Sequence, residues 1–145
     1  VHEVGGLFLA DPVTGVVEGH SGVTPAELER QLPGARFAEG DIDDEGWWNQ
    51  GKEMPAAGQG RAIGVAAQLR AMASSGVDVE RVGVVSHGDF LSHLLKALMD
   101  GLPAASAHYQ LANTGISRLG LSNEGTVVHY VNRVEHLDDA RWVSH

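Results

Sequence analysis

The chain has 145 residues, of which 43% are hydrophobic and 20% are charged, and it contains no cysteine. This composition is typical of a folded globular domain, and it excludes disulfides, thiolate metal sites and cysteine nucleophiles. The formal net charge of −9 argues against nucleic acid or an acidic membrane as a partner, because both require a basic surface.

The chain starts at Val1, and its first methionine is Met54. No positively charged, apolar leader precedes the fold, and no apolar run approaches the roughly 18 residues of a membrane span. We therefore expect a cytoplasmic protein whose start is a cut. Residues 1–10 indicate a strand end with a turn, and residues 11–22, with Gly, Pro and Ser, indicate a loop.

Thr24 begins a helix-start signature, because a proline follows it directly and an acidic residue falls in the first turn. The predicted helix runs to about Leu32 and ends at a Pro-Gly pair. Residues 38–60 are acidic and glycine-rich, and we expect a long loop there. Trp47 and Trp48, in its middle, favour an ordered loop that these two side chains anchor.

The next stretch alternates helix, strand and helix. Residues 61–75 place apolar side chains on one helical face, with Gly76 as the stop. The apolar run 81–86 is typical of a buried parallel strand, and residues 89–100 predict a second amphipathic helix. This order is typical of an α/β layered fold.

The last third predicts a hairpin, with strands at 116–122 and 126–134 joined by an Asn-Glu-Gly turn. We therefore expect a single α/β domain over 1–145, with a mainly parallel sheet and an antiparallel C-terminal element.

The most informative stretch is Ser86-His87-Gly88-Asp89, where the predicted strand runs directly into a helix. Ligands of α/β sheets bind at this end of the strands, and a helix N-terminus offers free N–H groups to an anion such as phosphate. Gly88 would let the backbone approach that ligand closely. The alternative is that His87 is a core histidine at a strand end.

Residues 82–101, VGVVSHGDFLSHLLKALMDG, resemble the second catalytic-histidine segment of the histidine phosphatase superfamily, also called phosphoglycerate-mutase-like. VHEVGG at the start resembles the segment that carries the family's acidic proton donor, which would be Glu3. The region from Thr24 to Trp48 resembles a variable insert, and residues 111–137 resemble the family's C-terminal strands. The resemblance implies a three-layer α/β/α fold.

The sequence departs from this family in one respect, since it contains no Arg-His-Gly motif, which carries the family's nucleophilic histidine. The resemblance therefore implies an incomplete domain that lacks the N-terminal segment with the first strand. A second copy in a homodimer, or a separate segment, would supply that strand.

By resemblance, the intact protein is a phosphohydrolase that cleaves a small phosphate monoester through a phosphohistidine, without a metal or other cofactor. His87 would stabilise the phosphoryl group, Glu3 would act as acid and base, and the Gly88 N–H would bind phosphate. Asn113 and Trp48 would lie on the substrate side, although an Asn-Thr-Gly turn explains Asn113 fully and a packed loop anchor is the commoner role for Trp48. Mutase-type transfer and a non-catalytic phospho-ligand or partner-binding module remain alternatives.

Three arginines are candidates for the local positive charge that a phosphate site needs: Arg61, Arg118 and Arg133. For each of them, an exposed or ion-paired surface residue is the alternative.

Overall fold

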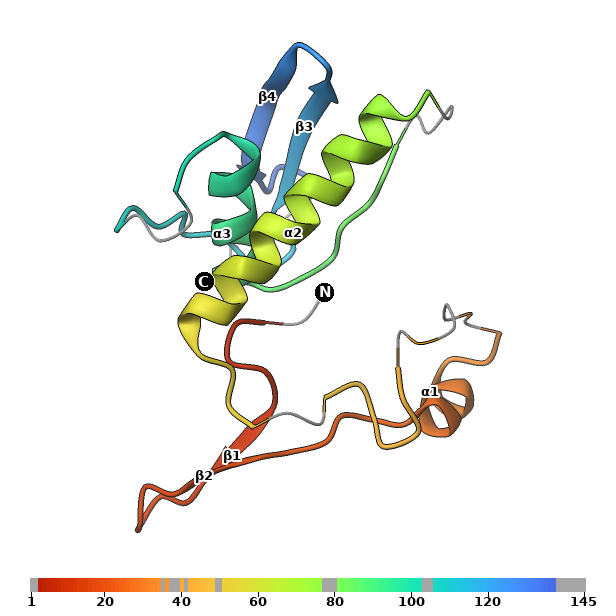
Figure 1. Ribbon diagram of the computed structural model, residues 1–145, viewed down its shortest axis with the longest axis vertical. Helices are drawn as coiled ribbons and strands as arrows, with labels where there is room; N and C mark the ends of the chain where they lie inside the picture. The colour runs from red at the N-terminus through yellow and green to blue at the C-terminus, as the bar shows by residue number, and fades with distance from the viewer. Residues whose placement is uncertain are drawn as a thin grey trace. The chain divides into compact units, whose positions relative to one another are not determined.

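The computed structural model of the chain describes residues 3–34, 36, 40, 42–48, 51–76, 81–102 and 106–137. Its elements are labelled in Figure 1. The chain divides into two compact units, a small one over Gly5–Pro55 and a large one formed by Val1–Val4 with Ala56–His145. Whether 1–145 is a single domain stays a prediction.

The small unit begins with a short antiparallel hairpin. Strand β1 (Phe8–Ala10) pairs with β2 (Val17–Gly19), and all residues of both strands are exposed. The Asp11 carboxylate accepts hydrogen bonds from the N–H groups of Val13 and Thr14, at 2.7 and 2.8 Å, which shapes the connecting turn. The prediction of a loop over 11–22 is therefore wrong at β2.

Helix α1 (Pro25–Gln31) follows and has the predicted start. The Thr24 hydroxyl accepts a hydrogen bond from the Glu27 N–H, and the Glu27 carboxylate accepts one from the Thr24 N–H at 2.9 Å. This reciprocal capping box satisfies N–H groups that the helix itself leaves without a partner.

The adjacent tryptophans anchor their loop as predicted. The Trp48 side chain is buried, and its indole N–H donates to the Gly51 carbonyl at 3.2 Å. The backbone of Gly6 lies so close to the Trp48 ring that a Cβ there would overlap the ring, and Gly22 is packed against Trp47 in the same way. Glycines are thus needed at both positions.

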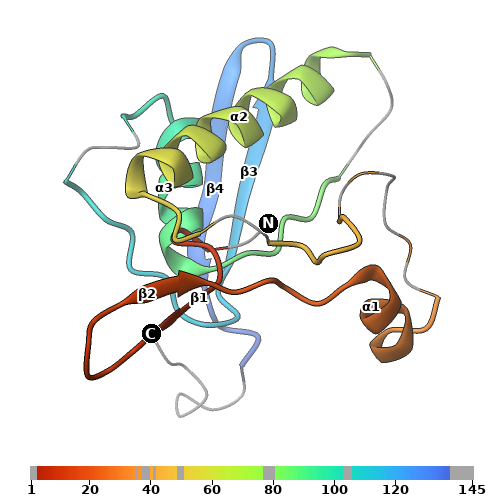
Figure 2. The same cartoon turned by 60° about the horizontal axis from the view of Figure 1, so that its bottom comes forward.

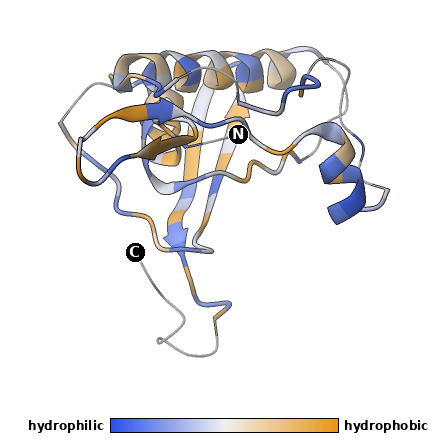
Figure 3. Ribbon diagram, turned by 90° about the horizontal axis from the view of Figure 1, so that it is seen from below, coloured by the Kyte–Doolittle hydropathy of each residue, from blue (hydrophilic) through white to orange (hydrophobic). Residues whose placement is uncertain are grey.

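The large unit is built on two helices, α2 (Pro55–Ser74) and α3 (Gly88–Leu98). Its core contains Ala62 and Ala66 of α2 with Phe90, Leu94, Ala97 and Leu98 of α3. Helix α2 begins six residues before the predicted start, because a proline opens it. Figure 3 shows hydrophobic and hydrophilic residues interspersed along α2, which buries a narrow stripe of small residues.

The antiparallel hairpin of the last third is confirmed. Strand β3 (Ile116–Ser122) pairs with β4 (Gly125–Arg133), and Leu119 and Leu121 pack against the core of the two helices. The pairing shifts register between Ile116 and Leu119.

The predicted parallel strand over 81–86 is not formed. Among the described residues, strands pair only as β1–β2 and β3–β4, both antiparallel, and residues 81–87 form a coil that leads into α3 (Figure 1). Val84 is packed against the core, but Val82 is 47% exposed and Val85 is 87% exposed. A strand requires the backbone of a neighbouring strand, and no described strand pairs with this segment.

Within the same described ranges, no helix combines the length and the apolar character that crossing a bilayer requires.

Candidate active site

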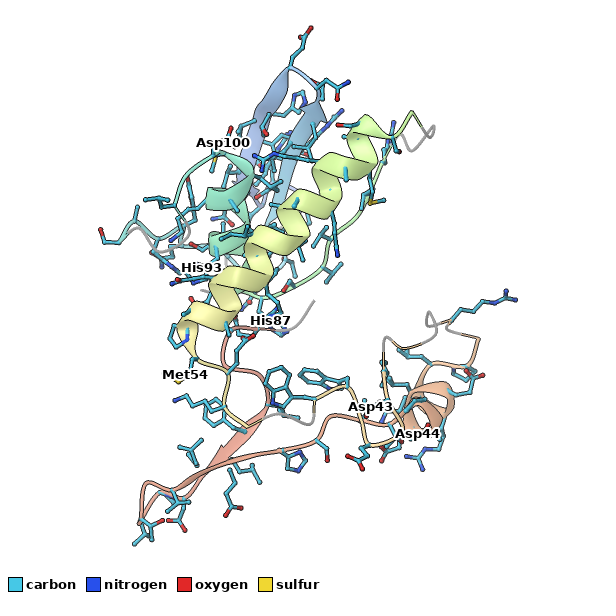
Figure 4. The ribbon with its side chains drawn as sticks, in the orientation of Figure 1. Asp43, Asp44, Met54, His87, His93 and Asp100 are labelled. Carbon is cyan, nitrogen blue, oxygen red and sulfur yellow. The ribbon has the colours of Figure 1, made fainter. Side chains whose placement is uncertain are left out.

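His87 is the N-cap of α3, with an extended backbone at φ −112° and ψ 166°. Its carbonyl accepts the Leu91 N–H at 2.9 Å, but its side chain makes no capping hydrogen bond and is exposed. The alternative of a core histidine is therefore wrong. In Figure 4, His87 lies at the start of α3, at the end of the coil 81–87 that leads into this helix.

The Glu3 carboxylate lies on the first turn of the same helix, although 86 residues of sequence separate it from Asp89. Its Oε2 accepts the Asp89 N–H at 3.2 Å, and its Oε1 accepts the Phe90 N–H at 2.9 Å. These donors are among the N–H groups that a helix leaves free at its positive end, where an anion is favoured. The structure thus brings the predicted acid and the predicted histidine turn together.

Glu3, His87 and the first turn of α3 form a cluster, and Arg61 of α2 adds a positive charge to it. Its Nη2 donates to the Glu3 carbonyl at 3.2 Å, and its guanidinium lies 4.5 Å from the centre of the Phe90 ring. The contact with the ring face is a cation–π interaction, which holds the guanidinium beside the first turn of α3. Arg133, by contrast, is paired with Glu135 at 3.0 Å.

Asp89 and His108 form the outer edge of the cluster. Their carboxylate and imidazole approach to 3.7 Å, and both side chains are more than half exposed, at 65% and 52%. His108 lies in a loop without any recognisable motif, so no signal in the sequence pointed to it.

Gly88 occupies the first position of α3. An added Cβ there would meet no described atom within 4 Å, so packing within the described chain does not require a glycine. The N–H groups that hold an anion in the structure are the next two along the helix, and a phosphate contact of the Gly88 N–H stays a prediction.

A comparison with protein-family models matches residues 15–134 to the histidine phosphatase superfamily (branch 1). The chain belongs to the histidine phosphatase superfamily. Searches of curated proteins and of solved structures found no match. Membership implies an α/β fold and supports a phosphatase or phosphotransfer function, since the superfamily contains both phosphatases and mutases. The matched region includes His87 and Gly88, whereas Glu3 precedes it.

Asn113 and Trp48 also fall within the region matched to the superfamily. Asn113 is exposed, in a turn closed by a hydrogen bond of 3.0 Å from the Gly115 N–H to the Ala112 carbonyl. Trp48 belongs to the small unit, where its indole is packed as described above. The turn and the loop anchor account for these two residues locally, and their place on the substrate side of a histidine phosphatase stays a prediction.

The part of this histidine phosphatase chain that the structure describes contains no group of three or more His, Cys, Asp or Glu side chains with metal-site geometry. Hollows in the surface of the described residues include one along β4 and one inside the β1–β2 hairpin. His87 lines neither of these two, and it lies exposed at the start of α3.

Proposed function

We propose that this chain is the larger part of a histidine phosphatase domain that hydrolyses a small phosphate monoester through a phosphohistidine intermediate. One observation carries the proposal. Glu3, His87 and the Arg61 side chain gather at the start of α3, where two backbone N–H groups hold a carboxylate. A site that binds one oxyanion in this way has donors suited to the oxygens of a phosphate.

In this proposal, His87 donates to the phosphoryl oxygens as charge develops on them. Removal of one such preorganised donor typically slows a reaction by about 10²–10³-fold. Glu3 protonates the leaving oxygen of the ester and then takes a proton from the water that attacks the phosphohistidine. General acid–base catalysis of this kind contributes about 10²–10⁴-fold.

Arg61 would offset the negative charge of the substrate. Its guanidinium is held by the Phe90 ring and the Glu3 carbonyl, so its position depends little on a ligand. This local positive charge matters because the chain as a whole carries a formal charge of −9, which would otherwise repel an anion.

The nucleophilic histidine would lie outside this chain, because the sequence contains no Arg-His-Gly motif. The segment 81–87 supports this view, since it leads to His87 but pairs with no described strand and leaves Val82 and Val85 exposed. We propose that a strand with the nucleophile pairs here and completes a mainly parallel sheet in a three-layer α/β/α fold. A preceding segment, a separate segment or a second copy in a homodimer would supply it.

Two alternatives remain for the same site. Phosphoglycerate-mutase-type transfer would use the same groups, with a second hydroxyl in place of water. A non-catalytic module that binds a phosphorylated ligand or partner is favoured by one observation, the lack of an Arg-His-Gly nucleophile in the chain. In each case Asn113 and Trp48 would lie on the substrate side of the site.

The test is hydrolysis of p-nitrophenyl phosphate by the full-length protein. We expect His87→Ala to lower kcat/KM by about 10²–10³-fold while circular dichroism stays unchanged. His129→Ala, which removes an exposed imidazole from β4, is the control and should retain activity. The 145-residue chain alone should show no turnover above background.

Near-wild-type turnover of His87→Ala would refute the role of that residue. Turnover by the chain alone would place the nucleophile within it. Phosphate binding by a full-length protein that does not turn over any ester would favour the binding module instead.

A further inference from the structure

One side chain of β4 holds the loop that leads into β3. The Asn132 Oδ1 accepts the Ala112 N–H at 2.8 Å, and its Nδ2 donates to the Gln110 carbonyl at 3.2 Å. Its backbone N–H donates to the Ser117 hydroxyl at 3.0 Å. The amide of Asn132 therefore replaces, for residues 110–112, the hydrogen bonds that a neighbouring strand would provide.

The backbone of Asn132 is in the left-handed region, with φ at 56°, although it lies inside a strand. Non-glycine residues rarely adopt this conformation, and asparagine tolerates it better than most. The fit against the loop is also close, because a Cβ on Gly115 would overlap the Asn132 Oδ1. Both features indicate that the position of the Asn132 side chain is tightly defined.

The other end of the same loop is tied to α3. The Tyr109 N–H donates to the fully buried Ser92 hydroxyl at 3.0 Å, and the Lys96 ammonium donates to the Ala107 carbonyl at 2.8 Å. Residues 107–115 therefore run from the side of α3 to the side chain of Asn132. The ion pair of His108 with Asp89 places this path beside the start of α3, and Figure 2 shows the segment after α3 returning to that end.

We propose that Asn132 is a positioning residue that fixes the turn 112–115 so that Asn113 contacts the phosphorylated substrate. This inference rests on the proposed function, because it takes the start of α3 as the phosphate site. Asn132 acts through Ala112, the first residue of the turn, and through Gln110, two residues before it, and it touches no substrate itself. Loss of its amide frees the turn while the β3–β4 hydrogen bonds persist.

The experiment compares three variants of the full-length protein by NMR. Asn132→Gly keeps the positive φ but removes the amide. Asn132→Asp keeps the shape and the acceptor, but replaces the donor to the Gln110 carbonyl by an oxygen that repels it. Asn123→Asp, in the exposed β3–β4 turn, is the control for the added charge.

The first readout is hydrogen exchange of the Ala112 amide, which we expect to be at least about 10-fold faster in Asn132→Gly. The second is the side-chain amide signal of Asn113 during a titration with inorganic phosphate. The wild type and Asn123→Asp should shift with phosphate. Asn132→Gly and Asn132→Asp should lose that shift, or need at least about 10-fold more phosphate.

Unchanged exchange of Ala112 in Asn132→Gly would overturn the proposal, and so would faster exchange with an unchanged phosphate response. A wild-type Asn113 signal that does not respond to phosphate would also overturn it. If Asn132→Gly fails to fold, Asn132→Asp decides the outcome by the second readout, the response of the Asn113 signal to phosphate. The proposed function is judged separately, by turnover of the His87→Ala protein.

Discussion

Glu3 and a substrate phosphate would compete for the same two N–H groups at the start of α3. The carboxylate accepts hydrogen bonds from Asp89 and Phe90, and a phosphate at the helix end would need these donors. A phosphate dianion carries more charge than a carboxylate, so the positive helix end and Arg61 favour it. In the proposed cycle, arrival of phosphate releases the Glu3 side chain close to the leaving oxygen.

The variant Glu3→Gln separates these two roles. We expect inorganic phosphate to bind about 2- to 5-fold more tightly, because a neutral amide no longer opposes the anion at the helix end. Turnover in the full-length protein should fall by about 10²–10⁴-fold, since an amide cannot transfer the proton. Calorimetry and steady-state kinetics measure the two effects.

Glu53→Gln is the matched control. The Glu53 carboxylate also accepts a backbone N–H, that of Gly5, but it belongs to the small unit and should leave both quantities unchanged. Weaker phosphate binding by Glu3→Gln would contradict the competition between carboxylate and phosphate.

At this scale, the sequence predicted Glu3 and the His87 turn as site residues, because both resemble motifs of a known family, and the structure brings the two together. The sequence indicated Arg61 only as one of three arginines that could supply the positive charge of a phosphate site. The contact that distinguishes Arg61 is with the Phe90 ring, which belongs to a different helix. His108 and Asn132 had no sequence signal at all, because each acts through a pairing that only the folded chain creates.

At the scale of elements, local signals predicted best. The capping residues of α1, the apolar periodicity of α3 and the turn of the β3–β4 hairpin each belong to one short stretch, and all three elements form. The first turns of α2 were predicted as loop because they contain glycines, although Gly58 is buried in the helix. A strand over 81–86 would require a partner strand, and the local sequence pattern does not show whether a partner is present.

The capping box of α1 predicts a pH dependence. The Thr24 N–H, and then its hydroxyl, hold the pKa of the Glu27 carboxyl below its usual value of 4.5. A lowered folded-state pKa stabilises the helix above the usual value, and this stabilisation is lost as the pH falls through the lowered pKa. The protection of the α1 amides, measured as exchange relative to an unfolded chain at the same pH, should therefore fall on acidification below about pH 4.5.

The variant Glu27→Gln should remove most of this pH dependence, whereas Glu29→Gln on the same helix should retain it. Thr24→Ala should destabilise the helix by about 0.5–2 kcal/mol at neutral pH. Equal pH profiles for Glu27→Gln and the wild type would show that the capping carboxylate is not the titrating group.

At the scale of the whole molecule, a substitution in the segment 81–87 tests whether a further strand pairs with this segment in the full-length protein. Val85 is 87% exposed, so Val85→Asp should change the stability of the 145-residue chain by no more than about 0.5 kcal/mol. If a strand pairs with this segment in the full-length protein, the same substitution buries a charge there. It should then cost about 2–4 kcal/mol in urea unfolding.

Val13→Asp is the control, because Val13 is 91% exposed in the turn of the β1–β2 hairpin. It should be nearly neutral in both proteins. An equally small effect of Val85→Asp in both would mean that no strand covers this segment, and the proposed parallel sheet of a three-layer α/β/α fold would be wrong.

The Glu3 carboxylate at the start of α3 also affects which anions can bind there. A side chain tethered beside its own binding position behaves as a ligand at high local concentration. Free carboxylic acids resemble Glu3 in charge and shape, so they gain little by displacing it and are kept out of the unliganded site. An anion with two negative charges displaces it at lower concentration. Glu3 would thus keep free carboxylates out of the unliganded site, and acetate should bind detectably only to the Glu3→Gln variant.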